Sequence, residues 1–216
     1  MKSSIFESLE RVLLLGPHPD DLEFSSGGTI AKMLKAGVEV HYAVFSMCEK
    51  SVPNGLPKDA IKKELIASSD FLGIKSEHLY LFNYEVRCLP QYRQEILEEM
   101  VRLNKDIRPE LIFIPSSHDV HQDHRTIYEE GLRAFKYNMI IGYEMPWNNF
   151  DSNYNLYVPL SEDELNTKIS ALRLYESQDF RAYNSEDLII ALAKVRGMQI
   201  KEKYAEAFEV IRLKFG

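Results

Sequence analysis

Two short clusters of histidine and aspartate contain the side chains in this sequence that could do chemistry together. The first, Pro17-His18-Pro19-Asp20-Asp21, directly follows an apolar run over residues 12–15. The second, over residues 117–124, follows another apolar run over residues 111–115. A short apolar run broken by turn residues is typical of a buried parallel strand, and open α/β sheets bind ligands beyond the carboxyl ends of such strands. We therefore expect the two clusters to meet at one edge of a sheet.

The spacing inside the first cluster indicates different roles for its acidic residues. Pro19 fixes its own φ and favours extended geometry at His18, so the loop should be stiff. His18 and Asp21 can then converge on one point while Asp20 projects elsewhere, as two metal ligands and one free base would. A lone Asp-Asp pair after a strand could equally cap the next helix. Capping does not explain why a second cluster follows a second strand.

The sequence resembles the LmbE-like, or PIG-L, family of zinc-dependent N-deacetylases. Pro17-His18-Pro19-Asp20-Asp21 matches the first motif of the family in full, and His121-Gln122-Asp123-His124 matches its second motif, a His-x-Asp-His. Weaker matches at Glu64, Leu72-Gly73 and Tyr204-Ala205-Glu206-Ala207-Phe208 extend the resemblance over most of the chain. The resemblance implies a single α/β domain over residues 1–216, a Rossmann-like three-layer sandwich with a mainly parallel sheet.

The two motifs contain the residues that a catalytic metal site needs. Such a site commonly takes three nitrogen or oxygen ligands from the protein and leaves a position for water, which the metal acidifies. His18, Asp21 and His124 supply that set. The remaining carboxylate, Asp20, would be the general base. We expect Zn²⁺ as the cofactor, although mixed nitrogen and oxygen ligation also admits Fe²⁺ or Co²⁺.

The resemblance also implies roles for the other residues of the second motif. A protonated His121 would stabilise the tetrahedral oxyanion, and Asp123 would fix the His121 ring and favour its charge. Whether Asp20 alone serves as both base and acid stays open. Asp119 is a candidate for orienting a ligand histidine.

Three further residues are candidates for substrate contacts. Trp147 and Asn148 lie in a loop over residues 145–150, where an aromatic face and amides would suit a sugar ring. The alternative is that Trp147 only fills the core. In the family, the helix expected over residues 59–72 supplies an arginine. Lys62 or Lys63 stands there instead, and an ammonium group cannot reproduce a bidentate guanidinium contact.

Periodicity and turn residues predict the remaining elements. Beyond the two strands above, we expect strands over residues 38–46, 79–82, 138–144 and 204–213, and helices over residues 30–37, 59–72, 91–104, 125–136, 162–176 and 185–197. Val101 is expected on or near the buried side of its helix. Gly27-Gly28 lacks the residues of a phosphate loop, which favours close packing of a helix on a strand.

Composition narrows the classes of protein. The chain of 216 residues is 45% hydrophobic and has no apolar run of the roughly 20 residues that a bilayer span needs. Residues 1–15 do not resemble a secretory signal, and two cysteines are too few for a disulfide framework, so we expect a cytoplasmic protein. A net charge of -7 argues against nucleic acid as a partner, although a local basic cluster could still bind one phosphate. Assembly into a homo-oligomer stays open.

The resulting prediction is an enzyme that hydrolyses the N-acetyl group of an N-acetylglucosamine-type sugar. One alternative is a non-catalytic, metal-containing sugar-binding protein, and another is an amidase for a thiol-conjugate amide. Asp20 argues against the first alternative, because a structural site has no need of an unliganded carboxylate. The Gly-x-Ser-x-Gly nucleophile elbow is missing, and neither Cys48 nor Cys88 has a histidine placed by a recognisable motif.

Overall fold

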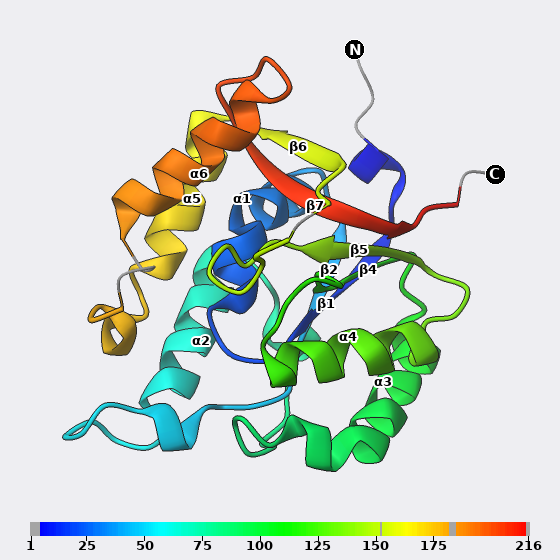
Figure 1. Ribbon diagram of the computed structural model, residues 1–216, viewed down its shortest axis with the longest axis vertical. Helices are drawn as coiled ribbons and strands as arrows, with labels where there is room; N and C mark the ends of the chain where they lie inside the picture. The colour runs from blue at the N-terminus through cyan, green and yellow to red at the C-terminus, as the bar shows by residue number, and fades with distance from the viewer. Residues whose placement is uncertain (1–4, 152, 182–184, 215–216) are drawn as a thin grey trace.

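The computed structural model describes residues 5–151, 153–181 and 185–214 (Figure 1). The described strands form one seven-stranded sheet in the order β3-β2-β1-β4-β5-β7-β6. Their bounds are β1 Arg11–Gly16, β2 Glu39–Val44, β3 Leu79–Leu81, β4 Leu111–Pro115, β5 Met139–Tyr143, β6 Leu156–Leu160 and β7 Tyr204–Arg212. Strands β1 to β5 pair in parallel, whereas β7 runs antiparallel to both β5 and β6. The predicted mainly parallel sheet is therefore confirmed.

Helices cover both faces of this sheet. Their bounds are α1 Asp21–Lys35, α2 Ala60–Leu72, α3 Arg93–Ile107, α4 Gln122–Ala134, α5 Glu162–Leu172 and α6 Glu186–Met198. Figure 1 shows α3 and α4 together on one side of the strands and α1, α5 and α6 on the other. This is the predicted three-layer, Rossmann-like arrangement.

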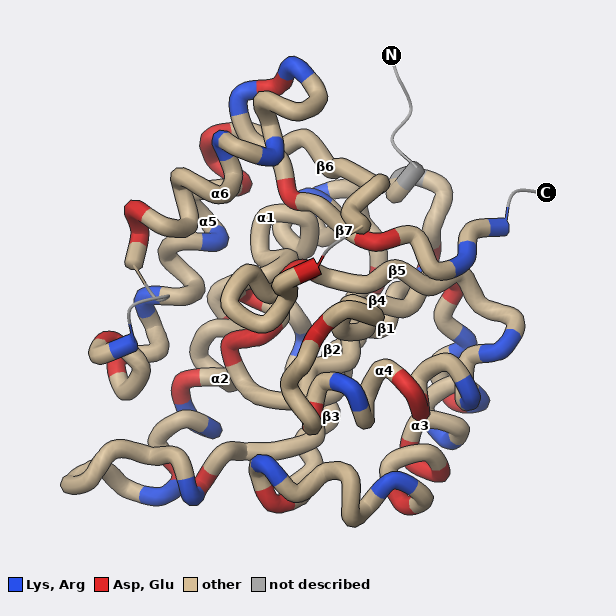
Figure 2. The backbone as a smooth tube through the Cα atoms, viewed as in Figure 1, with Lys and Arg blue, Asp and Glu red and all other residues tan. Residues whose placement is uncertain are grey.

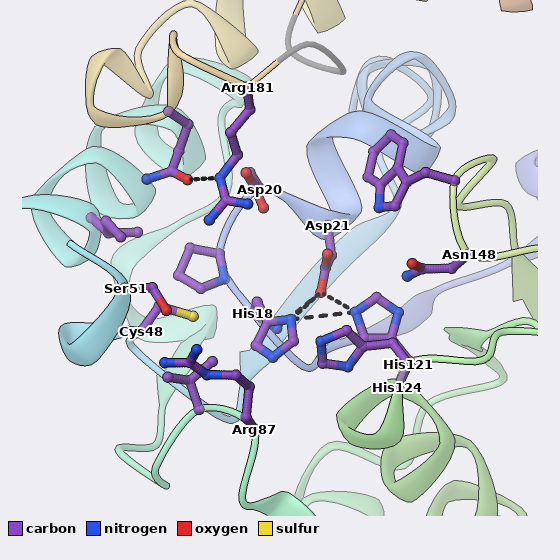
Figure 3. A pocket seen from close by; sticks show the side chains of 15 residues that line it. His18, Asp20, Asp21, Cys48, Ser51, Arg87, His121, His124, Asn148 and Arg181 are labelled. Atoms are coloured by element: carbon purple, nitrogen blue, oxygen red, sulfur yellow. Dashed lines mark hydrogen bonds and ion pairs between the residues drawn. The ribbon is translucent and has the colours of Figure 1, made fainter. Parts of the chain in front are cut away.

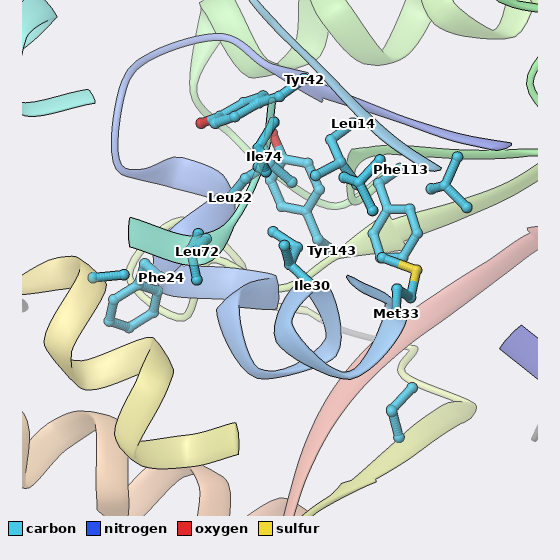
Figure 4. Packing of buried hydrophobic residues seen from close by; sticks show 14 of the residues in the cluster. Leu14, Leu22, Phe24, Ile30, Met33, Tyr42, Leu72, Ile74, Phe113 and Tyr143 are labelled. Carbon is cyan, nitrogen blue, oxygen red and sulfur yellow. The ribbon is translucent and has the colours of Figure 1, made fainter. Parts of the chain in front are cut away.

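The continuous apolar run in β1 forms a strand because both of its faces are covered. Side chains alternate along a strand, so Val12 and Leu14 face one hydrophobic core while Leu13 and Leu15 face the other. Figure 4 shows the first core, where Leu22 and Ile30 of α1 lie over the sheet residues. Charged residues occur mainly in the outer helices and loops, and β4 and β5 contain none (Figure 2).

Helix α1 begins earlier than predicted, at Asp21 instead of residue 30, and contains both Gly27 and Gly28. A Cβ atom added to Gly27 would lie 2.9 Å from Lys168 Cγ of α5, and one added to Gly28 would lie 2.5 Å from Leu160 Cδ1 of β6. The glycines therefore permit close packing, as predicted, but the neighbours are α5 and the edge strand β6.

The Tyr204–Phe208 segment also helps to hold α1. The Glu206 carboxylate accepts hydrogen bonds from the backbone N–H groups of Gly28 (3.0 Å) and Thr29 (2.7 Å), and Lys168 Nζ donates to it at 2.7 Å. All of these groups are buried, so the charges of Glu206 and Lys168 compensate each other inside the protein. This network anchors the helix whose first residue is Asp21.

Several predicted boundaries and one strand need correction. Strand β6 is missing from the predicted strands, because Pro159 interrupts its strand pattern. Since β6 is the last strand of the sheet, it tolerates a proline, which lacks an N–H donor. Helix α5 ends at Leu172, before a short 3-10 turn over Glu176–Gln178. Val101 of α3 is 45% exposed and not part of the core.

Among the described residues, no helix is both long and apolar enough to cross a bilayer.

We predict that Gly197→Ala destabilises the protein where α6 meets β7. Alanine gains up to about 1 kcal/mol in helix propensity. Its Cβ, however, would lie 2.7 to 2.8 Å from backbone atoms of Glu202, Lys203 and Tyr204, which cannot rotate away. Overpacking of this kind typically costs about 1–3 kcal/mol, so the net effect is a lower free energy of unfolding. Thermal denaturation should show a lower Tm, while the exposed substitution Lys194→Ala on the same helix should leave Tm unchanged. An unchanged Tm for Gly197→Ala would contradict the packing.

Candidate metal centre and active-site pocket

A pocket of about 350 Å³ lies beyond the carboxyl ends of the parallel strands (Figure 3). Residues that follow each of β1 to β5 line it, together with residues that follow α5. They are His18, Pro19, Asp20, Asp21, Cys48, Ser51, Ile61, Val86, Arg87, His121, His124, Trp147, Asn148, Gln178 and Arg181. The two sequence motifs therefore meet at one sheet edge, as expected, because β1 and β4 are parallel neighbours.

The three predicted ligands converge on one point. Asp21 Oδ2 lies 3.5 Å from His18 Nδ1 and 3.4 Å from His124 Nε2, and the two histidine nitrogens are 3.3 Å apart. Ligands about 2.0–2.1 Å from a tetrahedral Zn²⁺ are separated by about 3.3 Å. The spacing and the donor types of these three residues therefore fit a zinc-like cation.

Each of the two histidines of this group has a carboxylate on its other ring nitrogen. His18 Nε2 lies 2.8 Å from Asp123 Oδ2, and His124 Nδ1 lies 2.7 Å from Asp119 Oδ2. If these nitrogens hold the protons, His18 Nδ1 and His124 Nε2 keep free lone pairs toward the common point. Carboxylates in such positions orient metal-binding histidines and make them more basic. The expected orienting position of Asp119 is therefore the one observed.

The contacts of Asp123 differ from the prediction that it fixes the ring of His121. Its carboxylate is fully buried and accepts hydrogen bonds from the backbone N–H groups of Arg87 (2.6 Å) and Leu89 (3.2 Å), besides contacting His18. The hydrogen bond to His121 comes instead from the Asp123 backbone N–H, which donates to His121 Nδ1 at 3.1 Å. Asp123 thus orients a candidate ligand and the loop that contains Arg87.

This backbone contact also sets the protonation of His121. Because Nδ1 accepts a hydrogen bond, the single proton of a neutral imidazole lies on Nε2. Burial, together with the neighbouring His124 and His18, lowers the pKa of His121 to about 4 despite the nearby Asp123. The predicted contact of the Asp123 carboxylate with the His121 ring is therefore not the one observed, while the protonation of His121 during the reaction stays a prediction. A neutral His121 can still donate a hydrogen bond from Nε2.

Asp20 lies in the pocket without joining the ligand group. It has a left-handed φ of 72° at the start of α1, where its side chain makes no capping hydrogen bond. The capping alternative is therefore wrong for Asp20. Burial and the charges of Asp21 and Glu23 raise its pKa well above the ordinary value, although His18 and Arg181 act in the opposite direction. A strained, uncapped carboxylate beside a ligand group is typical of a functional position.

The substrate-contact candidates fall into two groups. Lys62 is exposed on α2 and is not among the lining residues; Lys63 is exposed as well and pairs with Asp59. Trp147 lines the pocket and also packs edge-on against Phe24 with ring centroids 4.5 Å apart, so it does help to fill the core, while its contact with a sugar stays a prediction. Asn148 lines the pocket, and its Nδ2 donates to Asp119 at 3.3 Å.

Sequence analysis missed the two arginines of the pocket, Arg87 and Arg181. Arg87 lies in the segment that follows β3, so the rule that ligands gather beyond strand ends could have found it. No comparable signal marks Arg181, which follows a 3-10 turn at some distance from any strand of the sheet. Cys48 also lines the pocket, where burial raises its pKa to about 11 and disfavours the nucleophilic thiolate.

His41 and His78 lie outside this pocket. With Glu39 they form another group of ligand-type atoms. Glu39 and His41 lie in the first half of β2 and His78 directly precedes β3, so this group is near the amino ends of the parallel strands. The pocket lies beyond the carboxyl ends of the same strands, so the two groups lie at opposite ends of the parallel strands.

The protein has a Rossmann-like sheet, and beyond the carboxyl ends of its parallel strands lie a His-Asp-His group and a separate carboxylate. These features define a class of α/β proteins that is suited to metal-assisted hydrolysis. The chain belongs to the PIG-L family, described as GlcNAc-PI de-N-acetylase, whose model matches residues 13–135. The family resemblance predicted from the two motifs is thus confirmed.

Individual relatives agree with this assignment. The chain is 27% identical over 196 residues to diacetylchitobiose deacetylase of Thermococcus kodakarensis, covering 80% of this chain and 72% of the relative. It is also similar to the structure of N,N'-diacetylchitobiose deacetylase from Pyrococcus horikoshii, with a TM-score of 0.80, 25% identity and coverage of 95% and 85% of the two chains. GalB, a 4-carboxy-2-hydroxymuconate hydratase from Pseudomonas putida, shares the fold at 16% identity, with a TM-score of 0.78 and coverage of 96% and 98%.

We predict that His18→Ala and His124→Ala each reduce bound metal to well below one ion per chain. Each substitution removes one of three converging ligands, and a site with two protein ligands holds a divalent cation weakly. Metal analysis after dialysis measures this stoichiometry. His78→Gln is the matched control, because it removes a histidine from the other ligand-type group. Equal metal content in parent and His124→Ala would exclude the ligand assignment.

Proposed function

We propose that this protein is a metal-dependent hydrolase that removes the N-acetyl group from an N-acetylglucosamine-type sugar or glycoconjugate, releasing acetate and a free amine. The observation that carries the proposal is the meeting of His18, Asp21 and His124 around one point, with Asp20 beside them and outside the group. A binding protein needs the ligands alone. A hydrolase also needs a base that the cation does not occupy.

His18, Asp21 and His124 would hold the cation, which we propose to be Zn²⁺, with Fe²⁺ or Co²⁺ as substitutes. When bound, such an ion acidifies water and polarises a carbonyl group. The protein prepares these ligands in advance. Although burial opposes the charge of Asp21, His124 and hydrogen bonds from His18 lower its pKa, so Asp21 is ionised and ready to bind a cation.

Asp20 is proposed as the base that removes a proton from the attacking water. Its raised pKa brings it closer to the operating pH, where a carboxylate can both accept and return a proton. As water adds to the amide carbon, Asp20 takes the proton and the carbonyl oxygen becomes an oxyanion. When the C–N bond breaks, Asp20 can return the proton to the departing amine. One residue can thus serve as base and acid.

His121 is proposed to stabilise the oxyanion as a neutral imidazole. Its Nδ1 already accepts the Asp123 backbone N–H, so its Nε2–H is the group available for donation into the pocket. A fixed donor that needs no reorientation is effective at a site of developing charge. Asp123 would support catalysis indirectly, through His18 and through its backbone contact with His121.

Several features favour a sugar as the carrier of the acetyl group. Trp147 offers an aromatic face and Asn148 an amide at one side of the pocket, and the diacetylchitobiose deacetylases provide the precedent for substrate class. We assign no substrate contact to Lys62, which lies outside the lining. We further propose that residues 1–216 form one deacetylase domain located in the cytoplasm.

We predict that the metal-loaded protein releases equal amounts of acetate and primary amine from N-acetylglucosamine derivatives. Asp20→Asn should lower kcat about 10²–10⁴-fold without loss of metal, since an amide cannot accept the water proton. Acetate and amine assays with metal analysis measure both effects. Asp179→Asn is the control, because Asp179 is exposed and absent from the pocket lining.

Each alternative function has its own outcome in this experiment. Amine released only from non-sugar amides would favour the thiol-conjugate amidase. Sugar binding without amine release would favour a non-catalytic protein. Turnover of an unsaturated acid without amide hydrolysis would favour a hydratase like GalB, whose fold is the same. Parental activity in Asp20→Asn would remove Asp20 from the mechanism.

We also predict that His121 causes no loss of rate as the pH rises through neutrality. With a pKa of about 4, His121 is already neutral there, and its Nε2–H remains available at higher pH. His121→Ala should lower kcat about 10²–10³-fold, as removal of an oxyanion donor does elsewhere. The pH profile of kcat for parent and His121→Ala measures this. An alkaline fall near neutral pH that disappears in His121→Ala would instead show that His121 acts in its protonated form.

A further inference from the structure

We propose that Glu39, His41 and His78 form a second site for a divalent cation of the zinc class, which joins strand β2 to the edge strand β3. The three side chains lie near the amino ends of the parallel strands, away from the pocket that contains His18 and Asp21. The inference concerns this second group alone, so it holds or fails independently of the proposed hydrolysis.

The pairing of two neighbouring strands places these side chains together. Side chains alternate along a strand, so Glu39 and His41 of β2 point to the same face of the sheet. The parallel register pairs Tyr42 with Leu79, and the residues directly before this pair are His41 and His78. Because neighbouring strands lie only about 4.7–4.9 Å apart, the two imidazoles come side by side. Two residues along one strand and one step across to the next thus bring all three polar groups to one place.

The distances within the group suit a small cation. The ligand-type atoms lie within 4.8 Å of one another. Glu39 Oε1 lies 2.7 Å from His41 Nε2 and 4.0 Å from His78 Nε2. Ligands about 2.0–2.1 Å from a tetrahedral Zn²⁺ are separated by about 3.3 Å, which lies between these two values. The Glu39 side chain is exposed, so a small shift of its carboxylate makes both distances equal.

Tyr80 orients the ring of His41. The imidazole is buried, and its Nδ1 lies 3.2 Å from the Tyr80 hydroxyl. This hydroxyl can accept a hydrogen bond from Nδ1–H, and Nε2 then presents its lone pair toward Glu39. Metal-binding histidines usually have such a partner on the other ring nitrogen. Burial lowers the pKa of His41, although Glu39 acts in the opposite direction, so the imidazole is neutral at neutral pH, as a ligand must be.

A simple ion pair accounts for only part of this group. One protonated imidazole would satisfy the Glu39 carboxylate through the short contact with His41. The second imidazole would then lie against a positive charge, because the two rings are in contact with centroids 4.1 Å apart. Two protonated rings at this separation would repel each other. A divalent cation in place of the shared proton makes all three groups favourable partners at once.

Donor types and surroundings decide which cation binds and how tightly. Two imidazole nitrogens and one carboxylate oxygen suit Zn²⁺, Co²⁺ or Ni²⁺, whereas Mg²⁺ and Ca²⁺ prefer oxygen ligands alone. Glu39 and His41 line a hollow beside the end of α3, so an ion can reach them from solvent. Arg11 and Arg108 line the same hollow, and their positive charges weaken cation binding. We therefore expect a weaker site than the one in the pocket, which dialysis empties and added metal fills.

The strand that this cation holds has little other support. β3 contains three residues, Leu79–Leu81, and pairs with β2 alone. The segment after it donates the backbone N–H groups of Arg87 and Leu89 to the buried Asp123 carboxylate. A cation that binds only when β2 and β3 are paired stabilises the folded state by mass action. The second site is therefore structural, and its loss leaves the pocket ligands in place.

The first experiment titrates the intact protein with metal. Dialysed protein is loaded with one equivalent of Zn²⁺ to fill the pocket site and is then titrated calorimetrically with more Zn²⁺ or with Mg²⁺. A second equivalent of Zn²⁺ should bind with lower affinity than the first, and Mg²⁺ should not bind in its place. At a Zn²⁺ concentration about 100 times the second Kd, Tm should rise by about 5–10 °C over the protein with one equivalent.

The second experiment identifies the ligands. His78→Gln and Glu39→Gln should each weaken the second equivalent more than about 10-fold, since even loss of an orienting partner typically costs about 10–100-fold. Tyr80→Phe removes only the orienting hydroxyl and should have a smaller effect. Glu77→Gln is the matched control, because Glu77 is an exposed carboxylate next to His78 and outside the group. It should leave both equivalents and the rise in Tm unchanged.

A third variant separates the two sites. His18→Ala/His124→Ala lacks two ligands of the pocket and should still bind one equivalent of Zn²⁺ with the affinity of the parent's second equivalent. If this variant is unstable, the parent titration decides the question. The absence of a second equivalent, or a second equivalent that His78→Gln and Glu39→Gln both leave unchanged, would overturn the site. A second equivalent that both substitutions abolish would establish it, whether or not the protein releases amine from any substrate.

Discussion

The arrangement of the site depends most on one buried carboxylate, that of Asp123. It contacts His18 Nε2 from the first motif and accepts backbone N–H groups of Arg87 and Leu89 from the segment after β3. The segments after β1 and β3 and the first turn of α4 are thereby joined at one fully buried charge. An ionised carboxylate in that position is tolerable only because all of these donors surround it, so the loops have to adopt this arrangement together. The candidate ligand His18 and the pocket loop that contains Arg87 therefore share one structural support.

The sheet supplies the second constraint. Parallel pairing of β1 with β4 brings the ends of both strands to one edge, and cores on both faces prevent either strand from shifting its register. Helix α1 begins at the last residue of the first motif, and Glu206 holds that helix from β7, at the far end of the chain. The separation of the ligand atoms thus depends on elements that contribute no ligand.

The fold by itself leaves the reaction undecided, since deacetylases and a hydratase share it. The assignment to hydrolysis comes from the site, where a carboxylate with a raised pKa and a neutral imidazole flank a ligand group. Specificity should depend on the pocket walls, which belong to loops of unequal length after each strand. In Figure 3, Asn148 lies on one side of the ligand group, and Arg87 and Arg181 lie on the other.

The sequence alone determined the strand-then-motif pattern, the parallel sheet and the choice of His18, Asp21 and His124 as candidate ligands, because strand periodicity and local spacing decide which side chains leave a strand end together. It did not predict β6, whose proline is acceptable only at a sheet edge, nor the early start of α1. Tertiary structure alone decided that Asp123 contacts His18, 105 residues away, and that Arg87 and Arg181 enter the pocket while Lys62 does not. The physical reason is that a buried side chain takes its partner from whatever the folded loops bring within hydrogen-bonding distance, and no local pattern in the chain records that proximity.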